Sequence, residues 1–566
     1  MLELSTEKKL GGLLAPVTAL RSRNDLGVGD TEALVEFVVW AAAKGFGLVQ
    51  ILPINETGND HSPYNIISSM AIDPLTISTT PDWLPDLTRK DFDAICAKHE
   101  VATLKPGPVK YAAVAALKRE LLQAAFRQIR TRKSDPMRAR AFARFETSEA
   151  DWLEPYSRFR ALIEWSETEI VDSWPAAHRS PSAVIEWESE LDAASRKRFR
   201  DLARFYRYVQ WVARTQWKTV RAACERLGVA LMGDIPVGVS LYSADVWETP
   251  IIFDTTRSSG APPEKVFATD LFTEKWGQNW GFPLYNWQGM SLDNFAWWRR
   301  RLHAACEIFH FLRVDHALGF FRIYSFPWRP QENERFTPLD PAQASAITGG
   351  PLPGFVAHDD STEENRERNR FQGEMLLRVF LEETGPHRLI AEDLGEVAPY
   401  VRPTLEALEV PGFKIPQWEY TDGHMTPGAD YQRLSLATFA THDHPPIRVL
   451  WERWAADPSA PHLQAMREML TFCGCPDLPV PQAFTPEIHA AFIRGLFASN
   501  SWLAVHQITD LFGLPDRFNV PGAVGNQNWT TRIEGPPAEW DTLHEDAITL
   551  ATAALKDTAR STLKDA

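Results

Sequence analysis

The sequence predicts an α/β protein built as a (β/α)8 TIM barrel, with large helical and loop insertions on the C-terminal face of the barrel. Short apolar stretches alternate with segments of helical periodicity along much of the 566-residue chain, which is typical of parallel βα units. Four of the apolar stretches also run into a carboxylate at their downstream end. In a parallel barrel these strand ends meet at one mouth, where active sites lie.

The first predicted elements are a helix over 30–45 and a buried strand over 49–54. Asp30 suits the N-cap of this helix because its side chain can accept hydrogen bonds from the first turn. Over 76–203 the residue pattern changes to charged helical segments, which indicates a mainly helical insertion. We therefore expect three parts, which are the start of a catalytic barrel over 1–75, the insertion over 76–203, and the remainder of the barrel over 204–566.

The alternation of strands and helices resumes with a predicted helix from Arg204 to about Leu227. Further helices are predicted over 293–309 and 364–384. The additional predicted strands are 230–237, 310–317, 387–393, 413–417, 436–442 and 501–506. Seven or eight candidate strands suit a closed barrel. The predicted loop insertions lie at about 247–290 and 325–362.

Composition excludes several classes of protein. The formal net charge of −15 argues against a nucleic-acid partner or an anionic membrane surface, because phosphate binding needs a basic face. The first ten residues lack the apolar run of a secretory signal, and no apolar run approaches the ~20 residues of a membrane span.

Five scattered cysteines are expected to be reduced thiols in a cytoplasmic protein. Twenty-one Trp residues suit sugar binding, although they could also fill a large core.

The four acids at the strand ends are Asp234, Asp315, Glu392 and Asp443. Arg313 and Asp315 are two positions apart on one predicted strand, so their side chains share a face. A guanidinium beside a carboxylate keeps that carboxylate ionised, which suits a nucleophile. A purely structural ion pair is the alternative interpretation.

Glu392 ends an apolar strand and is followed directly by Asp393. Burial and a like-charged neighbour both raise the pKa of a carboxyl group, which favours a general acid. A helix-capping role is the alternative for this pair. Asp443 could stabilise positive charge, while the adjacent His442 donates to a sugar hydroxyl. A nucleophilic acid, a general acid and a stabilising acid together match retaining glycoside chemistry, in which the first two carboxyls lie about 5–5.5 Å apart.

A metal site is a rival interpretation of one of these segments. His442 and His444 are two positions apart, on one face of the predicted strand, which is a spacing seen for metal ligands in barrel hydrolases. Asp315 and Glu392 would have to complete such a site.

Beyond these single positions, the chain resembles the 4-alpha-glucanotransferase family (amylomaltase, or disproportionating enzyme), a branch of the alpha-amylase clan. The resemblance covers about 11–75 and 204–535, and its motifs occur in the family's order. They are Gly29-Asp30, Gln50-Ile-Leu-Pro53, Ser62-Pro-Tyr64, Gly233-Asp-Ile-Pro236, Ser243-Ala-Asp-Val-Trp247, Pro262-Pro263, Gly277-Gln-Asn-Trp-Gly281, Pro283-Leu-Tyr285, Arg313-Val-Asp-His316, Gly319-Phe320, Ala391-Glu-Asp-Leu-Gly395, Thr441-His-Asp443, Arg517-Phe-Asn-Val-Pro-Gly522 and Asn528-Trp529.

The resemblance implies a role for each matching residue. Asp315 would be the nucleophile, Glu392 the acid/base and Asp443 the transition-state stabiliser. The implied substrate-binding residues are Tyr64, Asp234, Gln278, Trp280, Arg313, His316, His442 and Asn519. Gln278 and Trp280 would belong to a loop over the acceptor side. The family needs no cofactor and no metal, and its substrates are maltooligosaccharides, maltose, glucose or a glycogen-like glucan.

Several departures from the family pattern concern the acceptor rather than the chemistry. His444 stands where the family has Asn, Glu264 and Lys265 stand where it has Asp-Tyr, and the loop from Pro263 to Gly277 is longer than usual. Some motifs are most similar to the second type of disproportionating enzyme, which moves glucose from maltose onto a glycan. The resemblance thus implies an alpha-retaining glucanotransferase. The alternatives are a hydrolase with the same carboxylates, a metal-dependent barrel hydrolase and an inactive glycan-binding protein.

Overall fold

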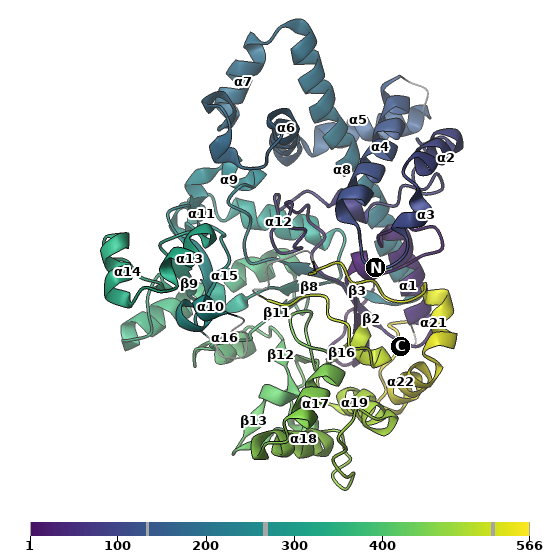
Figure 1. The fold of residues 1–566 in the computed structure, drawn as a ribbon, viewed down its shortest axis with the longest axis vertical. Helices are drawn as coiled ribbons and strands as arrows, with labels where there is room; N and C mark the ends of the chain where they lie inside the picture. The colour runs from purple at the N-terminus through teal and green to yellow at the C-terminus, as the bar shows by residue number, and fades with distance from the viewer. Residues whose placement is uncertain (1, 132–134, 264–269, 522–526, 565–566) are drawn as a thin grey trace.

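A parallel eight-stranded sheet forms the centre of the computed structural model, in the order β11-β8-β3-β2-β1-β16-β15-β12. The Ala391 amide donates to the Pro411 carbonyl at 2.9 Å, which joins β11 to the segment before β12 and curls the sheet into a nearly closed barrel (Figure 1). The structure describes residues 2–131, 135–263, 270–521 and 527–564. The strands are β1 (Leu10–Leu14), β2 (Leu48–Gln50), β3 (Ala230–Ile235), β8 (Phe311–Val314), β11 (Leu389–Ala391), β12 (Gly412–Lys414), β15 (Ser435–Ala437) and β16 (Leu503–Gln507). The predicted (β/α)8 barrel is confirmed.

The strand β1 is the one barrel strand that the sequence did not predict. It pairs with both β2 and β16, although two of its five residues are Gly11 and Gly12. Glycine inside a strand weakens the sequence signal, but here it allows close approach. A Cβ on Gly11 would lie 2.1 Å from the Leu555 side chain, and one on Gly12 would lie 2.9 Å from Leu48. The neighbouring side chains would have to shift to admit a larger residue at either position.

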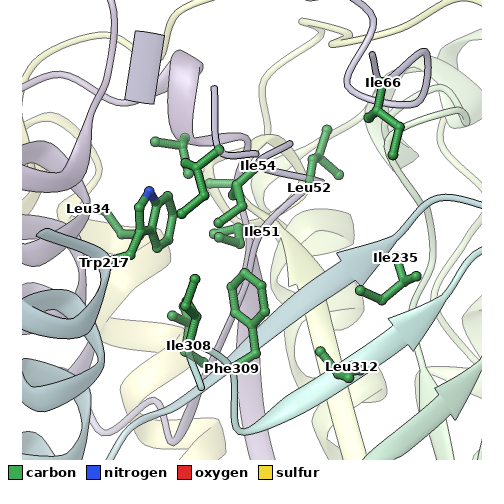
Figure 2. Packing of buried hydrophobic residues seen from close by; sticks show 14 of the residues in the cluster. Leu34, Ile51, Leu52, Ile54, Ile66, Trp217, Ile235, Ile308, Phe309 and Leu312 are labelled. Carbon is green, nitrogen blue, oxygen red and sulfur yellow. The ribbon is translucent and has the colours of Figure 1, made fainter. Parts of the chain in front are cut away.

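Two helices cover the first barrel strands. The helix α1 (Thr31–Ala43) begins after Asp30, whose carboxylate accepts from the amides of Glu32 and Ala33, as the sequence predicted. The helix α8 (Ala193–Leu227) begins at Ala193 rather than at Arg204, and it therefore runs across residue 203 as one continuous helix. Figure 2 shows Trp217 of α8 packed with Phe309, whose ring lies edge-on at 6.2 Å.

Helices occupy most of the segment 76–203, and α5 to α8 form the upper lobe in Figure 1. An aromatic cluster stabilises this lobe, with Trp187 edge-on to Trp165 at 5.5 Å and to Phe199 at 5.1 Å. The elements are α2 (Arg89–Lys98), α3 (Val101–Leu104), α4 (Tyr111–Arg130), α5 (Pro136–Ser148), α6 (Ala150–Ser166), the 3-10 turns η3 (Val171–Ser173) and η4 (Ala176–His178), and α7 (Pro181–Glu190).

The two predicted loop insertions combine into a second, antiparallel sheet, which we call the loop sheet. Its strands are β10 (Gly354–Val356), β9 (Ile323–Phe326), β5 (Ser258–Ala261) and β6 (Gln278–Asn279), in that order. An aromatic core backs it, in which the Trp328 and Phe336 rings stack at 3.8 Å and Trp276 of α10 (Leu271–Trp276) lies edge-on to Trp328 at 5.7 Å. The sequence did not predict this sheet, because its partners are far apart in the chain.

The remaining elements surround the barrel. The predicted helices 293–309 and 364–384 correspond to α12 (Ala296–Cys306) and α15 (Glu363–Thr384). All five cysteines are free thiols, and across the described ranges no helix is long and apolar enough to cross a membrane. The other helices and short strands are α9 (Ala244–Glu248), β4 (Phe253–Asp254), β7 (Leu284–Tyr285), α11 (Trp287–Ser291), α13 (Asn333–Phe336), α14 (Pro341–Thr348), α16 (Val401–Ala407), β13 (Tyr420–Thr421), β14 (His424–Met425), α17 (Ile447–Ala456), α18 (Ala460–Phe472), α19 (Pro486–Ala498), α20 (Ile508–Phe512), α21 (Pro537–Leu543) and α22 (Glu545–Asp557).

Candidate active site

Three of the four predicted acids meet around one buried arginine at the mouth of the barrel. Arg313 on β8 places Nη1 2.6 Å from Asp234 Oδ2 and 3.0 Å from Asp315 Oδ1. The other terminal nitrogen of this guanidinium, Nη2, lies 3.9 Å from Glu392 Oε2. Asp315 directly follows the last residue of β8, and its side chain is in contact with Arg313, so the expected pairing of these two residues is confirmed. Because β3, β8 and β11 are neighbours in the barrel, their carboxylates gather at one point.

Glu392 is held in one orientation by the backbone. Its Oε2 accepts from the His316 amide at 2.8 Å, and its Oε1 accepts from the Leu394 amide at 3.1 Å. Burial raises the pKa of Glu392 to about 8, and the Asp315 carboxylate adds to this rise while Arg313 opposes it. Glu392 therefore carries a proton at neutral pH, as a general acid must. The expected upward shift of this pKa is confirmed.

Asp443 lies in the loop after β15. Its Oδ2 is 3.1 Å from His442 Nε2, and its Oδ1 accepts from Asn519 Nδ2 at 2.6 Å. Burial alone would raise the pKa of Asp443, but the His442 and Asn519 contacts hold it below its usual range. Asp443 is thus an anion at neutral pH, with about a third of its side chain (35%) exposed to the mouth.

An aromatic wall faces these acids. The Tyr64 and His442 rings stack at 4.8 Å with only 15° between their planes, and Trp529 lies 6.1 Å from Tyr64. The Tyr64 hydroxyl donates to Asp234 Oδ2 at 2.7 Å. Asp234 is buried and is shared between Tyr64 and Arg313, so in the structure it positions both of these residues. An aromatic face beside fixed polar groups suits a sugar ring.

Trp280 follows the loop-sheet strand β6 and reaches back to the mouth of the barrel. Its ring lies edge-on to His316 at 4.9 Å, and its Nε1 donates to Gln278 Oε1 at 3.1 Å. Burial lowers the pKa of His316 to about 4, so its ring is neutral at pH 7. His316 adopts the left-handed backbone region with φ of 43°, which is uncommon outside glycine. This turn presents the His316 amide to Glu392 and its ring to Trp280.

The histidine pair considered as a metal site does not converge on one point. The strand predicted over 436–442 ends at Ala437, so His442 and His444 lie in a loop and do not share a strand face. The His442 ring contacts Tyr64 and Asp443, whereas His444 Nδ1 lies 2.7 Å from Thr441 Oγ1. Within the described ranges, no three His, Cys, Asp or Glu side chains are arranged to hold a metal ion.

Two contributors to the site were not among the predicted binding residues. Trp529 closes the aromatic wall, and Arg517 Nη2 donates to the Asp443 carbonyl at 2.8 Å. Both residues belong to the C-terminal motifs of the family resemblance, and these motifs could have pointed to them as site residues. The departures Glu264 and Lys265, and the motif residue Gly522, lie outside the described residues.

The fold and the site together define a class of protein. A parallel barrel that holds a protonated Glu, an Arg-bound Asp and a low-pKa Asp at its mouth is typical of enzymes that cleave or transfer glycosidic bonds. Residues 15–538 match the model of the 4-alpha-glucanotransferase family, and the chain belongs to this family. It is therefore a glycosyl-transferring enzyme, as the sequence predicted.

Individual relatives agree along the length of the chain. A 4-alpha-glucanotransferase of Chlamydia caviae is 30% identical over 552 residues, which cover 95% of this chain and 92% of that protein. One from Thermus thermophilus is 29% identical over 541 residues, covering 92% and 94%. Among solved structures, an amylomaltase from Streptococcus agalactiae in complex with acarbose has a TM-score of 0.75 at 22% identity, covering 98% of this chain and all of that one. This structural likeness supports the fold.

Proposed function

We propose that the chain is an alpha-retaining 4-alpha-glucanotransferase. It moves a glucosyl or alpha-1,4-glucan segment from a donor maltooligosaccharide to the 4-hydroxyl of an acceptor glucan or glucose. The proposed donors and acceptors are maltooligosaccharides, maltose, glucose and a glycogen-like glucan, and the proposed location is the cytoplasm. The family relationship supports the reaction, and the contacts of Arg313 support the assignment of the residues.

In the first proposed step, a carboxylate oxygen of Asp315 attacks C1 of the donor sugar while the bond from C1 to the glycosidic oxygen breaks. Glu392 gives its proton to that oxygen, so the leaving sugar departs with a neutral 4-hydroxyl. Asp443 lies beside the ring as an anion and stabilises the positive charge that develops near C1. His442 binds a hydroxyl of the same sugar.

In the second step, the acceptor 4-hydroxyl gives its proton to the Glu392 carboxylate and its oxygen attacks C1. The bond between C1 and Asp315 breaks, and the free carboxylate of Asp315 is restored. Two displacements at C1 return the alpha configuration. Glu392 regains its proton, so the cycle needs no other proton source.

The observation that carries this proposal is the shared guanidinium. One group, Arg313, contacts both Asp315 at 3.0 Å and Glu392 at 3.9 Å, so the two carboxyls face the same small space. Retaining enzymes need this proximity, because their nucleophile must reach C1 directly, without a water between.

A product chromatogram tests the proposal. Incubation with maltotriose alone should give a ladder of longer glucans together with glucose, because each enzyme-bound segment is passed to another sugar. Asp315→Ala and Glu392→Gln should each abolish the ladder while maltotriose binding is retained. The matched control is Glu396→Gln, four positions after Glu392, where the side chain is 58% exposed. This variant should keep the ladder.

Two outcomes would contradict the proposal. Glucose and maltose without longer products would indicate a hydrolase. Full activity of Asp315→Ala would show that Asp315 is not the nucleophile.

A further inference from the structure

A pocket of about 350 Å³ opens beside the candidate site. This volume falls in the usual range for ligand pockets, which is about 300–1,000 Å³. Segments of the barrel loops, of the helical insertion and of the loop sheet line it together. They are 58–67, 169–170, 240–242, 280–282 and 329–331. Tyr242, Glu169 and Arg329 lie in this pocket wall and have no part in the proposed transfer steps.

The pocket wall is linked to the proposed acid through Trp280 and His316. Trp280 lines it, and the Trp280 ring lies 4.9 Å from the ring of His316. The His316 amide in turn donates to Glu392 at 2.8 Å. In the proposed reaction, Glu392 protonates the oxygen that leaves with the acceptor-side sugar. A wall that continues outward from Trp280 therefore lies along the path of the acceptor chain.

Tyr242 forms a fixed aromatic part of this wall. Its hydroxyl donates to Asp172 Oδ2 at 3.0 Å, and Asp172 belongs to the 3-10 turn η3 of the helical insertion. Arg179 secures that turn, because its guanidinium donates to the carbonyls of Trp174 at 2.7 Å and Asp172 at 2.8 Å. The Tyr242 side chain is half-buried, so its ring offers an apolar face while its polar end is held.

Polar groups surround the aromatic faces. Glu169, also from the insertion, accepts from the Asn59 amide at 3.2 Å and joins the insertion to the barrel loop 58–67. Arg329, which also lines the pocket, donates to the Gly281 carbonyl at 3.3 Å. Aromatic rings with a few oriented polar groups are the lining that a sugar unit requires.

We propose that Tyr242, positioned by Asp172, is the platform for a sugar unit beyond the reacting acceptor glucose. The helical insertion thereby sets the preference of the enzyme for longer acceptors over free glucose. This inference rests on the proposed function, since it assigns a specificity residue to the same transfer reaction.

Acceptor competition measures this preference directly. With maltopentaose as donor, the variants are compared for kcat/KM with labelled glucose, maltose and maltotriose as acceptors. Tyr242→Ala should lower the ratio of maltotriose to glucose use about tenfold, which corresponds to about 1.4 kcal/mol. Asp172→Asn and Tyr242→Phe keep the ring but weaken its anchor, so each should lower the ratio by about two- to threefold. Tyr420→Ala, which removes a 48% exposed tyrosine on β13, should leave the ratio unchanged.

Each remaining outcome overturns the inference. An unchanged ratio in Tyr242→Ala would show that the pocket holds no acceptor sugar, and an equal loss for all three acceptors would indicate a positional role only. A raised KM for the donor at an unchanged ratio would place the pocket on the donor side. Circular-dichroism melting of each variant confirms folding, and Tyr242→Phe supplies the answer if Tyr242→Ala does not fold. Failure of the proposed function itself is distinct, because the unmodified enzyme would then form no labelled product with any acceptor.

Discussion

At the scale of single residues, Arg313 organises the candidate site. Its guanidinium contacts Asp234, Asp315 and Glu392, so three carboxyl groups share a single buried cation. Arg also binds carboxylates through a planar fork that Lys lacks. The site therefore depends on this side chain for its geometry as well as for its charge.

The pH profile tests the state of Glu392. Its pKa of about 8 means that the proton required for leaving-group departure is lost as the pH rises through about 8, so kcat/KM should fall there. A profile recorded from pH 5 to 10 with maltotriose measures this limb. A donor such as maltosyl fluoride, whose leaving group needs no proton, should show a weaker decline in its first step. A rate that stays constant up to pH 10 would contradict the assignment.

The same pKa predicts a change in stability. Between about pH 4.5 and 8, the folded protein keeps a proton on Glu392 that the unfolded chain has released. The folded state binds more protons in this window, so the contribution of Glu392 to the free energy of unfolding declines as the pH rises. Urea unfolding of the unmodified protein and of Glu392→Gln across this window should show a smaller decline for the variant.

At the scale of elements, the loop sheet carries Trp280 to the mouth of the barrel. The sheet has its own aromatic core of Phe272, Trp276, Phe326, Trp328 and Phe336. A separate core allows the sheet to act as a cover whose stability differs from that of the barrel. Covering the mouth would limit the access of water to the proposed enzyme-bound intermediate.

Trp276→Ala tests this role of the loop sheet. Removing a buried Trp costs roughly 3–5 kcal/mol of packing free energy. Here the loss falls on the aromatic core that backs the loop sheet. We expect the ratio of transfer to hydrolysis to fall several-fold, as measured by the free glucose and the longer glucans formed from maltotriose. Trp187→Ala disrupts the aromatic cluster of the helical insertion instead and serves as the control. If both variants shift the ratio equally, the cover is not the cause.

At the scale of the whole molecule, one arginine near the C-terminus joins the two ends of the chain. Arg560 is 1% exposed and donates to five backbone carbonyls, which belong to Phe497, Leu10, Trp502, Ser499 and Ser501. Leu10 begins β1, Phe497 lies in the last turn of α19, and Ser499, Ser501 and Trp502 lie between α19 and β16. The residue thereby closes the end of the barrel opposite the candidate site.

Arg560→Met should therefore lower stability without altering the chemistry. Leaving buried carbonyls unpaired costs about 1–3 kcal/mol per group, so we expect a loss of at least about 3 kcal/mol in the free energy of unfolding. Urea titration measures the loss, and kcat with maltotriose should be retained at low temperature. Arg368→Met, which breaks a surface pair whose arginine side chain is 57% exposed, should cost about 0–1 kcal/mol. Equal losses in the two variants would contradict the role of Arg560.

The candidate site could be predicted to the extent that its residues follow local rules. Alternation from Arg313 on β8 to Asp315 directly after it brings their side chains into contact, and burial raises the pKa of Glu392 at the end of β11. The strand-face argument failed for His442 and His444, because β15 ends at Ala437 and the loop after it sets their directions.

The sequence by itself determined the fold class, seven of the barrel strands and the acids at their ends, because hydrophobic periodicity and strand ends are local properties of the chain. Only the tertiary structure decided which distant segments meet. It pairs glycine-rich β1 with β2 and β16, joins two loops into one sheet, and brings Asn519 to Asp443 and Asp172 to Tyr242. Such contacts depend on close packing between segments far apart in the chain, which periodicity does not encode.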